Sequence, residues 1–231
     1  MAQEDVKRLV AYSSISHMGF CVLGLFALNH QGIAGGVLQM INHGLATGAL
    51  FAIVGMLYER YHTRMIADFG GMARVMPRLA VVTTIIVMSS IGLPGLNGFV
   101  GEVLILLGAF KTSKLSGALA AVGIVLGAYY MLTLLQRAFF GELSVPGSGT
   151  QEGRAGDLKW HELAALVPVA VACFWIGLWP AFFIERIAPA IDVIVDRSHR
   201  VTASRLAPHR QETARRALAE QTKNGGRDYR G

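Results

Sequence analysis

Charged residues are scarce in this chain, and long stretches contain none. Of the 231 residues only 16% are charged and 53% are hydrophobic, whereas about a quarter of the residues in an average soluble domain are charged. No Lys, Arg, Asp or Glu occurs between Arg8 and Glu59. A helix needs about 20 residues to cross the hydrocarbon core of a membrane. The scarcity of charge therefore excludes a disordered chain and predicts an integral membrane protein.

Cysteines are few in this sequence, and nucleotide-binding motifs do not occur. The two cysteines, Cys21 and Cys173, lie inside apolar runs, where we expect small buried hydrophobic side chains. Without a CxxC pair the sequence predicts no zinc or iron–sulfur site. It contains neither a GxxxxGK loop nor a GxGxxG motif after a strand. We therefore expect no metal, no cofactor and no redox chemistry in this chain itself.

The net charge of +6 comes from the end of the chain. Residues 1–196 carry 12 basic and 12 acidic residues, whereas residues 197–231 carry nine basic and three acidic ones. A nucleic-acid-binding module needs a basic face on a folded domain, so we expect no nucleic-acid partner. We predict a transmembrane domain over residues 1–190 and a basic, disordered tail over residues 191–231. A short polar helix over 208–222 is the alternative for the tail.

The apolar runs predict an all-α transmembrane helix bundle with about five spans. These runs cover residues 9–29, 33–58, 79–110, 115–140 and 163–184. The third run would form a straight helix of about 48 Å, much longer than a membrane requires. Near its middle lies Pro94, and proline removes a backbone donor and clashes with the preceding turn. We therefore predict a span broken near Pro94; a re-entrant hairpin and a simple turn between two spans are the alternatives.

The loops between the predicted spans carry most of their basic residues on one side of the membrane. With the N-terminus inside, nine Lys and Arg residues lie on the inner side and three on the outer side. Cytoplasmic loops are enriched in Lys and Arg, so this orientation is favoured. Five spans then place the basic tail outside, which the same rule disfavours. A sixth crossing or a miscounted third span would resolve this conflict.

Glu102 is the strongest candidate for a functional residue, because ionisable groups inside a membrane are rare and costly. It lies shortly after the break and is the only acidic residue between Asp68 and Glu142. An ionised carboxylate at the membrane centre costs about 3 kcal/mol, so we expect Glu102 to take up and release a proton. The alternative is pairing with Lys111 or Lys114, which lie about 13 to 18 Å away along a helix.

Two histidines inside the first and second runs are the next candidates. Ser13 and His17 lie one helical turn apart, and Gln39, His43 and Thr47 share one face of the second run. Imidazole titrates in the physiological range and can relay protons through its two nitrogens. We predict proton transfer for His17 and His43; hydrogen bonding between helices without a proton-carrying role is the alternative.

Other polar residues are assigned by their position along the chain. Tyr129, Thr133 and the pair Gln136/Arg137 form a further polar line on the fourth run, which we expect to face the same hydrophilic interior. Glu59 and Arg60 fall in the loop after the second run. We expect solvated ion pairs there, which contribute little to stability.

Four stretches of the sequence carry a family resemblance. They are DVKRLVAYSSISHMGF at 5–20, QMINHGL at 39–45, LYER at 57–60 and IGLPGLNGFVGE at 91–102. With these stretches in this order, the chain resembles the C-terminal part of the proton-translocating membrane subunit of NADH:quinone oxidoreductase, or respiratory complex I, of the chain M and mitochondrial subunit 4 type. The resemblance covers about residues 4–185.

The resemblance implies that the chain couples quinone reduction to proton transfer along a polar axis inside a bacterial plasma membrane. It implies contacts with the lipid bilayer and with other membrane subunits of the respiratory complex. Within that family Glu102 matches the acidic residue of the broken helix, and His17 and His43 match histidines of the hydrophilic axis.

Family members carry a longer series of spans, of which this chain keeps about the last five. The resemblance therefore implies a truncated subunit, either a fragment of a gene or a chain whose missing helices come from another chain. Three alternatives remain: a subunit of a multi-subunit cation/proton antiporter, a subunit of a membrane-bound hydrogenase, and a structural remnant that does not pump.

Overall fold

The computed structural model describes residues 3–144, 156–198, 200–201 and 204. The chain divides into two units, Met1–Ala188 and Pro189–Gly231. In the second unit the described residues 189–198 are helical. Most of the predicted tail, including the alternative helix over 208–222, lies outside the described residues, so its disorder stays a prediction.

The first unit is a bundle of helices. Its elements are α1 (Val6–Phe26), α2 (His30–Tyr61), the 3-10 helix η1 (Ile66–Asp68), α3 (Met72–Val75), α4 (Pro77–Ser90), α5 (Asn97–Thr112), α6 (Lys114–Phe139) and α7 (Trp160–Leu178). Four of them, α1, α2, α6 and α7, are long and apolar enough to cross a membrane. The predicted all-α polytopic bundle is therefore confirmed.

A turn at residues 27–29 joins α1 to α2. The side chain of Asn29 accepts a hydrogen bond from the backbone N–H of Gly32 at 2.9 Å, and its Nδ2 donates to the carbonyl of Gly108 at 2.8 Å. An asparagine that caps free backbone donors in this way starts a helix. The predicted first run, which extends to residue 29, and second run, which begins at residue 33, are therefore separated too late, because the cap at Asn29 brings residues 30–32 into α2.

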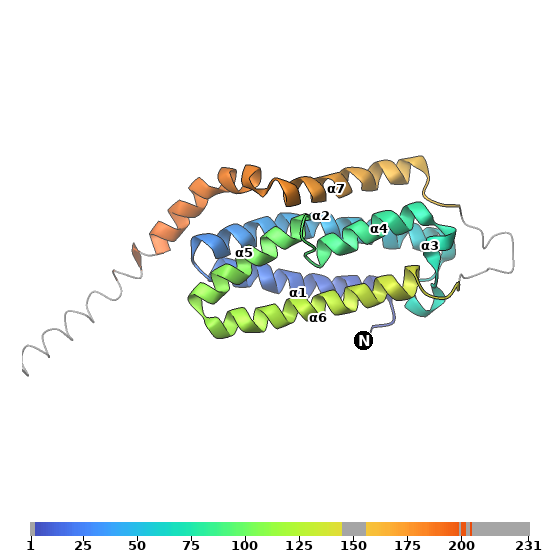
Figure 1. Cartoon of the computed structure of the whole chain (residues 1–231), viewed down its shortest axis with the longest axis horizontal. Helices are drawn as coiled ribbons and strands as arrows, with labels where there is room; N and C mark the ends of the chain where they lie inside the picture. Colours follow the sequence, from blue (N-terminus) through green and yellow to red (C-terminus); the bar gives the residue numbers. More distant parts are fainter. Residues whose placement is uncertain (1–2, 145–155, 199, 202–203, 205–231) are drawn as a thin grey trace, which may run out of the picture. The chain divides into compact units, whose positions relative to one another are not determined.

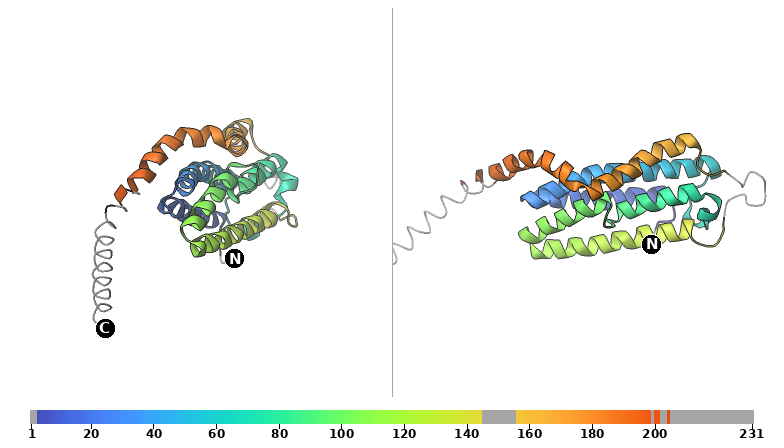
Figure 2. Two further views of the ribbon diagram at one scale, coloured as in Figure 1. Left: turned by 60° about the vertical axis from the view of Figure 1, so that its left-hand side comes forward. Right: turned by 45° about the horizontal axis from the view of Figure 1, so that its top comes forward.

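The third predicted span is broken as expected. Helices α4 and α5 follow one another along the long direction of the bundle, so that together they run beside α1 and α2 (Figures 1 and 2). Residues 91–96 separate them, and Gly92 and Gly95 within this segment have φ angles of +73° and +92°. L-residues with side chains rarely adopt such angles, so the two glycines allow the chain to turn here. We call residues 91–96 the break.

The last predicted span is shorter than expected. Helix α7 ends at Leu178 instead of continuing to residue 184, and helical residues resume at Pro180. Proline has no backbone N–H and is favoured at the start of a helix, which explains the interruption. Near its end α7 packs on the break, because a Cβ added to Gly177 would lie 2.5 Å from the carbonyl oxygen of Gly95.

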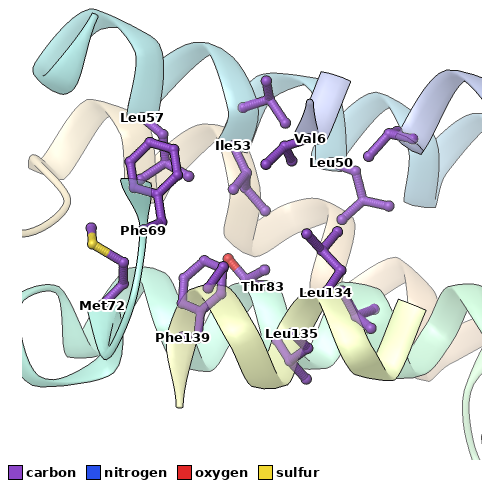
Figure 3. A pocket seen from close by; sticks show the side chains of 14 residues that line it. Val6, Leu50, Ile53, Leu57, Phe69, Met72, Thr83, Leu134, Leu135 and Phe139 are labelled. Atoms are coloured by element: carbon purple, nitrogen blue, oxygen red, sulfur yellow. The ribbon is translucent and has the colours of Figure 1, made fainter. Parts of the chain in front are cut away.

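The end of the bundle where α3 lies has an apolar interior. It encloses a cavity of about 30 Å³ lined by side chains of α1, α2, α4, α6 and the η1–α3 segment. Figure 3 shows Leu50, Ile53, Leu134 and Leu135 around it, with Thr83 among them. The hydroxyl of Thr83 is buried and has no hydrogen-bond partner. This region therefore offers almost nothing to an ion or a proton.

Candidate functional site

Glu102 lies on α5, in the second turn after the break. Only 6% of its surface is exposed, and side chains of α1 and α6 line the space beside it. Its carboxylate lies against the backbone of the break, because a Cβ added to Gly92 would collide with Glu102 Oε2. The positive φ angle and this close approach both require glycine at position 92. The break therefore shapes the pocket that holds the carboxylate.

His17 of α1 faces this carboxylate. Its Nδ1 lies 3.8 Å from Glu102 Oε1, and the residue is 9% exposed. This distance exceeds that of a hydrogen bond, so a proton can pass between the two groups only through a water molecule or after a small movement. The structure thus brings together two of the predicted site residues from helices far apart in sequence.

His43 of α2 continues the line. Its ring stacks on that of His17, with 5.4 Å between the ring centroids and 29° between the planes. His43 is half-buried, and its Nδ1 lies 3.1 Å from the hydroxyl oxygen of Thr47, one turn further along α2. All three predicted residues, together with Thr47, therefore lie in one line of polar side chains across three helices.

A small cavity adjoins the line. It has a volume of about 10 Å³ and is lined by His17 and Glu102 together with Gly123, Gly127 and Tyr130 of α6. This is close to the least space that a single water molecule needs. The cavity thus offers room for one water molecule beside both titratable groups.

The polar line predicted on α6 is wrong. Tyr129 is 67% exposed, and the hydroxyl of Thr133 donates only to the backbone of its own helix. The neighbouring Tyr130 faces the interior instead, and its hydroxyl donates to Ser13 Oγ at 2.9 Å. Small residues let helices approach closely, and Gly123 and Gly127 mark the packed face of α6. The helical spacing of these two glycines to Tyr130 is a sequence pattern that indicates the inward face of α6, whereas polarity alone does not indicate it.

A second group of polar side chains is buried beside the break. Gln39 belongs to the polar face predicted for the second run, with Asn42 alongside it, whereas the sequence predicts no role for Asn97 or Ser89. Asn42 and Gln39 of α2 are 2% and 3% exposed, and Asn97 at the start of α5 is fully buried. Asn42 Nδ2 donates to the backbone carbonyl of Asn97 at 2.7 Å and to Gln39 Oε1 at 3.4 Å. Ser89 near the end of α4 donates to Asn97 Oδ1. These four residues, which we call the amide cluster, connect α2 to both sides of the break.

The expectation of weak, solvated ion pairs is wrong for Arg60. Its Nη1 and Nη2 donate to Glu162 Oε1 and Oε2 at 2.7 and 2.6 Å, and only 11% and 9% of the two side chains are exposed. Glu162 also accepts a hydrogen bond from the backbone N–H of Lys159. The pair fastens α7 to α2. The partners lie 102 residues apart in the chain, so local spacing could not reveal them.

These features define a class of protein: a polytopic helical membrane protein with one interrupted span and a line of titratable side chains beside the interruption. Within the described part of the chain, no three His, Cys, Asp or Glu side chains gather to hold a metal ion.

The family model described as NADH:quinone oxidoreductase/Mrp antiporter, TM matches residues 1–127. The chain belongs to this family.

Known proteins resemble the chain over most of its length. NADH-quinone oxidoreductase subunit M of Rhodobacter capsulatus is 40% identical over 199 residues, which are 86% of this chain and 38% of the relative. A chain of respiratory complex I from Thermus thermophilus with bound NADH superposes with a TM-score of 0.78 at 36% identity, covering 84% of this chain and 40% of that one.

A chain of the Mrp complex from Dietzia sp. DQ12-45-1b has a TM-score of 0.75 at 21% identity, covering 87% of this chain and 45% of that chain; this match shows a shared fold. The chain spans less than two fifths of the length of the curated subunit M relatives, 38% of the Rhodobacter capsulatus subunit.

Proposed function

We propose that the chain is the proton-transferring C-terminal part of a subunit M of bacterial NADH:quinone oxidoreductase. Quinone reduction elsewhere in the complex would drive protons along its polar line. The observation that carries the proposal is the buried carboxylate of Glu102, which the break holds 3.8 Å from His17 Nδ1. The 40% identity to the Rhodobacter capsulatus subunit supports it.

The geometry suggests the order of the transfers. Inside a membrane the neutral form of a carboxyl group is favoured over an ionised form that lacks a partner, so Glu102 stores a proton. A water molecule in the adjoining cavity passes this proton to Nδ1 of His17. Stacked rings present their faces and not their nitrogens to each other, so a further water molecule or a ring movement has to carry the proton from His17 to His43, after which the hydroxyl of Thr47 continues the line along α2.

The direction of net transfer has to be imposed from outside this chain. Protons on interacting groups titrate as a coupled set, so a change in local charge next to one group redistributes protons over the whole line. We propose that neighbouring membrane subunits supply this change and further spans of the proton path. We also propose the bacterial plasma membrane as the location, with the exposed apolar side chains of α6, such as Leu119 and Val125, facing lipid or those subunits.

The test is Glu102→Gln in the assembled complex. Glutamine keeps the shape of the side chain but cannot carry the proton, so proton pumping in vesicles should fall at least about tenfold. The matched control is Glu59→Gln, which removes an exposed carboxylate from α2 and should leave pumping unchanged. Full pumping by Glu102→Gln would refute the proposal. Transport that needs sodium ions and no quinone reduction would favour the antiporter alternative.

A further inference from the structure

One face of α7 packs against the break and against both helices that it joins. Cys173 and Gly177 lie four residues apart on α7 and therefore share this face. Cys173 is fully buried, and its thiol is in hydrogen-bond contact with the side chains of Ser89 near the end of α4 and Asn97 at the start of α5. Gly177, one turn further on, lies against the backbone of residues 95 and 96.

The contact at Gly177 leaves no room for a side chain. A Cβ added there would lie 2.5 Å from the carbonyl oxygen of Gly95 and 2.6 Å from Leu96 Cα. Glycine at a helix interface permits such a close approach. Both neighbouring atoms belong to the backbone and cannot rotate away as the end of a flexible side chain can. A larger residue at position 177 therefore has to push α7 and the break apart.

The contact at Cys173 lies where α4 and α5 already touch each other. Ser89 donates to Asn97 Oδ1, and a Cβ added to Gly98 would collide with the carbonyl oxygen of Ser89. Asn97 Nδ2 is buried and forms no other hydrogen bond with the described residues. A thiol is both a weak donor and a weak acceptor. Cys173 therefore adds a polar contact from α7 at the point where the two ends of the break meet.

We propose that Cys173 and Gly177 are positioning residues for Glu102: they hold the break in the shape that places Gly92 against the carboxylate. Their effect passes through the backbone, because α7 contacts residues 95–97 and Glu102 contacts Gly92, which belongs to the same short segment. Close-packed interiors transmit displacements, so moving α7 away from the break moves the carboxylate. This role rests on the function proposed above, in which Glu102 carries the proton.

The first test enlarges the residue at the closest contact. Gly177→Ala in the assembled complex should lower proton pumping at least about tenfold, because small misplacements of a reacting group have effects of this size or larger. The matched control is Gly70→Ala, where a Cβ would collide with the carbonyl oxygen of Glu142, away from the break; this variant should pump at close to the normal rate. Equal losses in the two variants would overturn the role of Gly177, because they would reflect tight packing in general.

The second test concerns the thiol. Cys173→Ala removes the polar contact and should lower pumping about two- to threefold, the effect of one weak hydrogen bond. Cys173→Ser retains a donor and an acceptor and should restore most of the rate. Cys21→Ala is the matched control, since it shortens the other buried cysteine and should pump normally. Normal pumping by Cys173→Ala, or no recovery in Cys173→Ser, would refute the role of Cys173. These two variants also decide the proposal if Gly177→Ala does not assemble.

A third measurement does not depend on the function of Glu102. Buried thiols are unreactive, so N-ethylmaleimide should label Cys173 slowly in a chain that carries Cys21→Ala. Adding Gly177→Ala should speed this labelling at least about tenfold, since it exposes the thiol, whereas adding Gly70→Ala should not. Equal labelling rates would show that Gly177 does not hold α7 on the break. If the rates differ as expected but Glu102→Gln pumps normally, the proposed function fails while the contact between α7 and the break stands.

Discussion

Two carboxylates of this bundle have similarly small exposed fractions but lie in different surroundings. Glu102 is 6% exposed and Glu162 is 7% exposed. Glu162 receives two hydrogen bonds from the guanidinium of Arg60 and one from the backbone N–H of Lys159. Among the described residues, the titratable side chain that forms an ion-pair contact with Glu102 is His17, at 3.8 Å. Burial alone therefore does not define a proton-carrying residue. A fixed cation keeps a carboxylate charged and structural, whereas a carboxylate without one is free to exchange its proton.

The comparison predicts different effects of the same substitution on stability. Glu162→Gln removes the counter-ion of Arg60, and because hydrogen bonds to charged groups contribute about 1.5 to 3 kcal/mol, stability should fall by about that amount. Glu102→Gln removes a buried carboxylate that has no fixed cation, so stability should not fall. The measurement is the free energy of unfolding of the 231-residue chain in detergent micelles, followed by circular dichroism.

A second substitution checks that the cost comes from the orphaned cation. In the double variant Arg60→Gln with Glu162→Gln no charge is left behind, so part of the lost stability should return. Equal losses of unfolding free energy for Glu102→Gln and Glu162→Gln would show that the two carboxylates are equivalent in their effect on stability.

The two glycines of the break test whether the backbone positions the carboxylate of Glu102. Gly92 and Gly95 both have positive φ angles, but only at Gly92 would a Cβ meet Glu102; at Gly95 nothing lies within 4 Å. Gly95→Ala should cost about 1 to 2 kcal/mol through backbone strain alone. Gly92→Ala should cost more and should also displace the carboxylate, so proton pumping falls only in that variant. Equal pumping by both variants would mean that the break does not position Glu102.

Much of the fold and of the polar line follows from local sequence, because both depend on local patterns. Apolar runs fix the spans, and Pro94 between closely spaced glycines fixes the break. A lone acidic residue after that break identifies Glu102 as a carboxylate inside the bundle. Helix ends were less predictable, since Asn29 had to be recognised as a cap and Pro180 as the start of a new helix.

Contacts between helices that are distant in the chain could not be predicted from the sequence. The Arg60–Glu162 pair joins α2 to α7, and the amide cluster joins α2 to both sides of the break. Neither has a local pattern, because each depends on how the helices pack. Polarity predicts the wrong inward face for α6, because the glycines that allow close packing mark that face and the polar side chains do not.

The smallest predicted effect extends the comparison to neutral groups. Thr83 and Thr84 are neighbours on α4, but the hydroxyl of Thr83 is buried without a partner, whereas that of Thr84 donates to the carbonyl of Ala80 at 2.7 Å. Thr83→Val keeps the shape and removes an unsatisfied group, so it should stabilise the chain by about 1 kcal/mol. Thr84→Val breaks a hydrogen bond and should destabilise it slightly, by about 0.5 kcal/mol. The same unfolding measurement decides. If both variants shift stability in the same direction, the free-energy cost of burying a polar group in this bundle does not depend on whether the group has a hydrogen-bond partner. The contrast between Glu102 and Glu162 would then lose its physical basis.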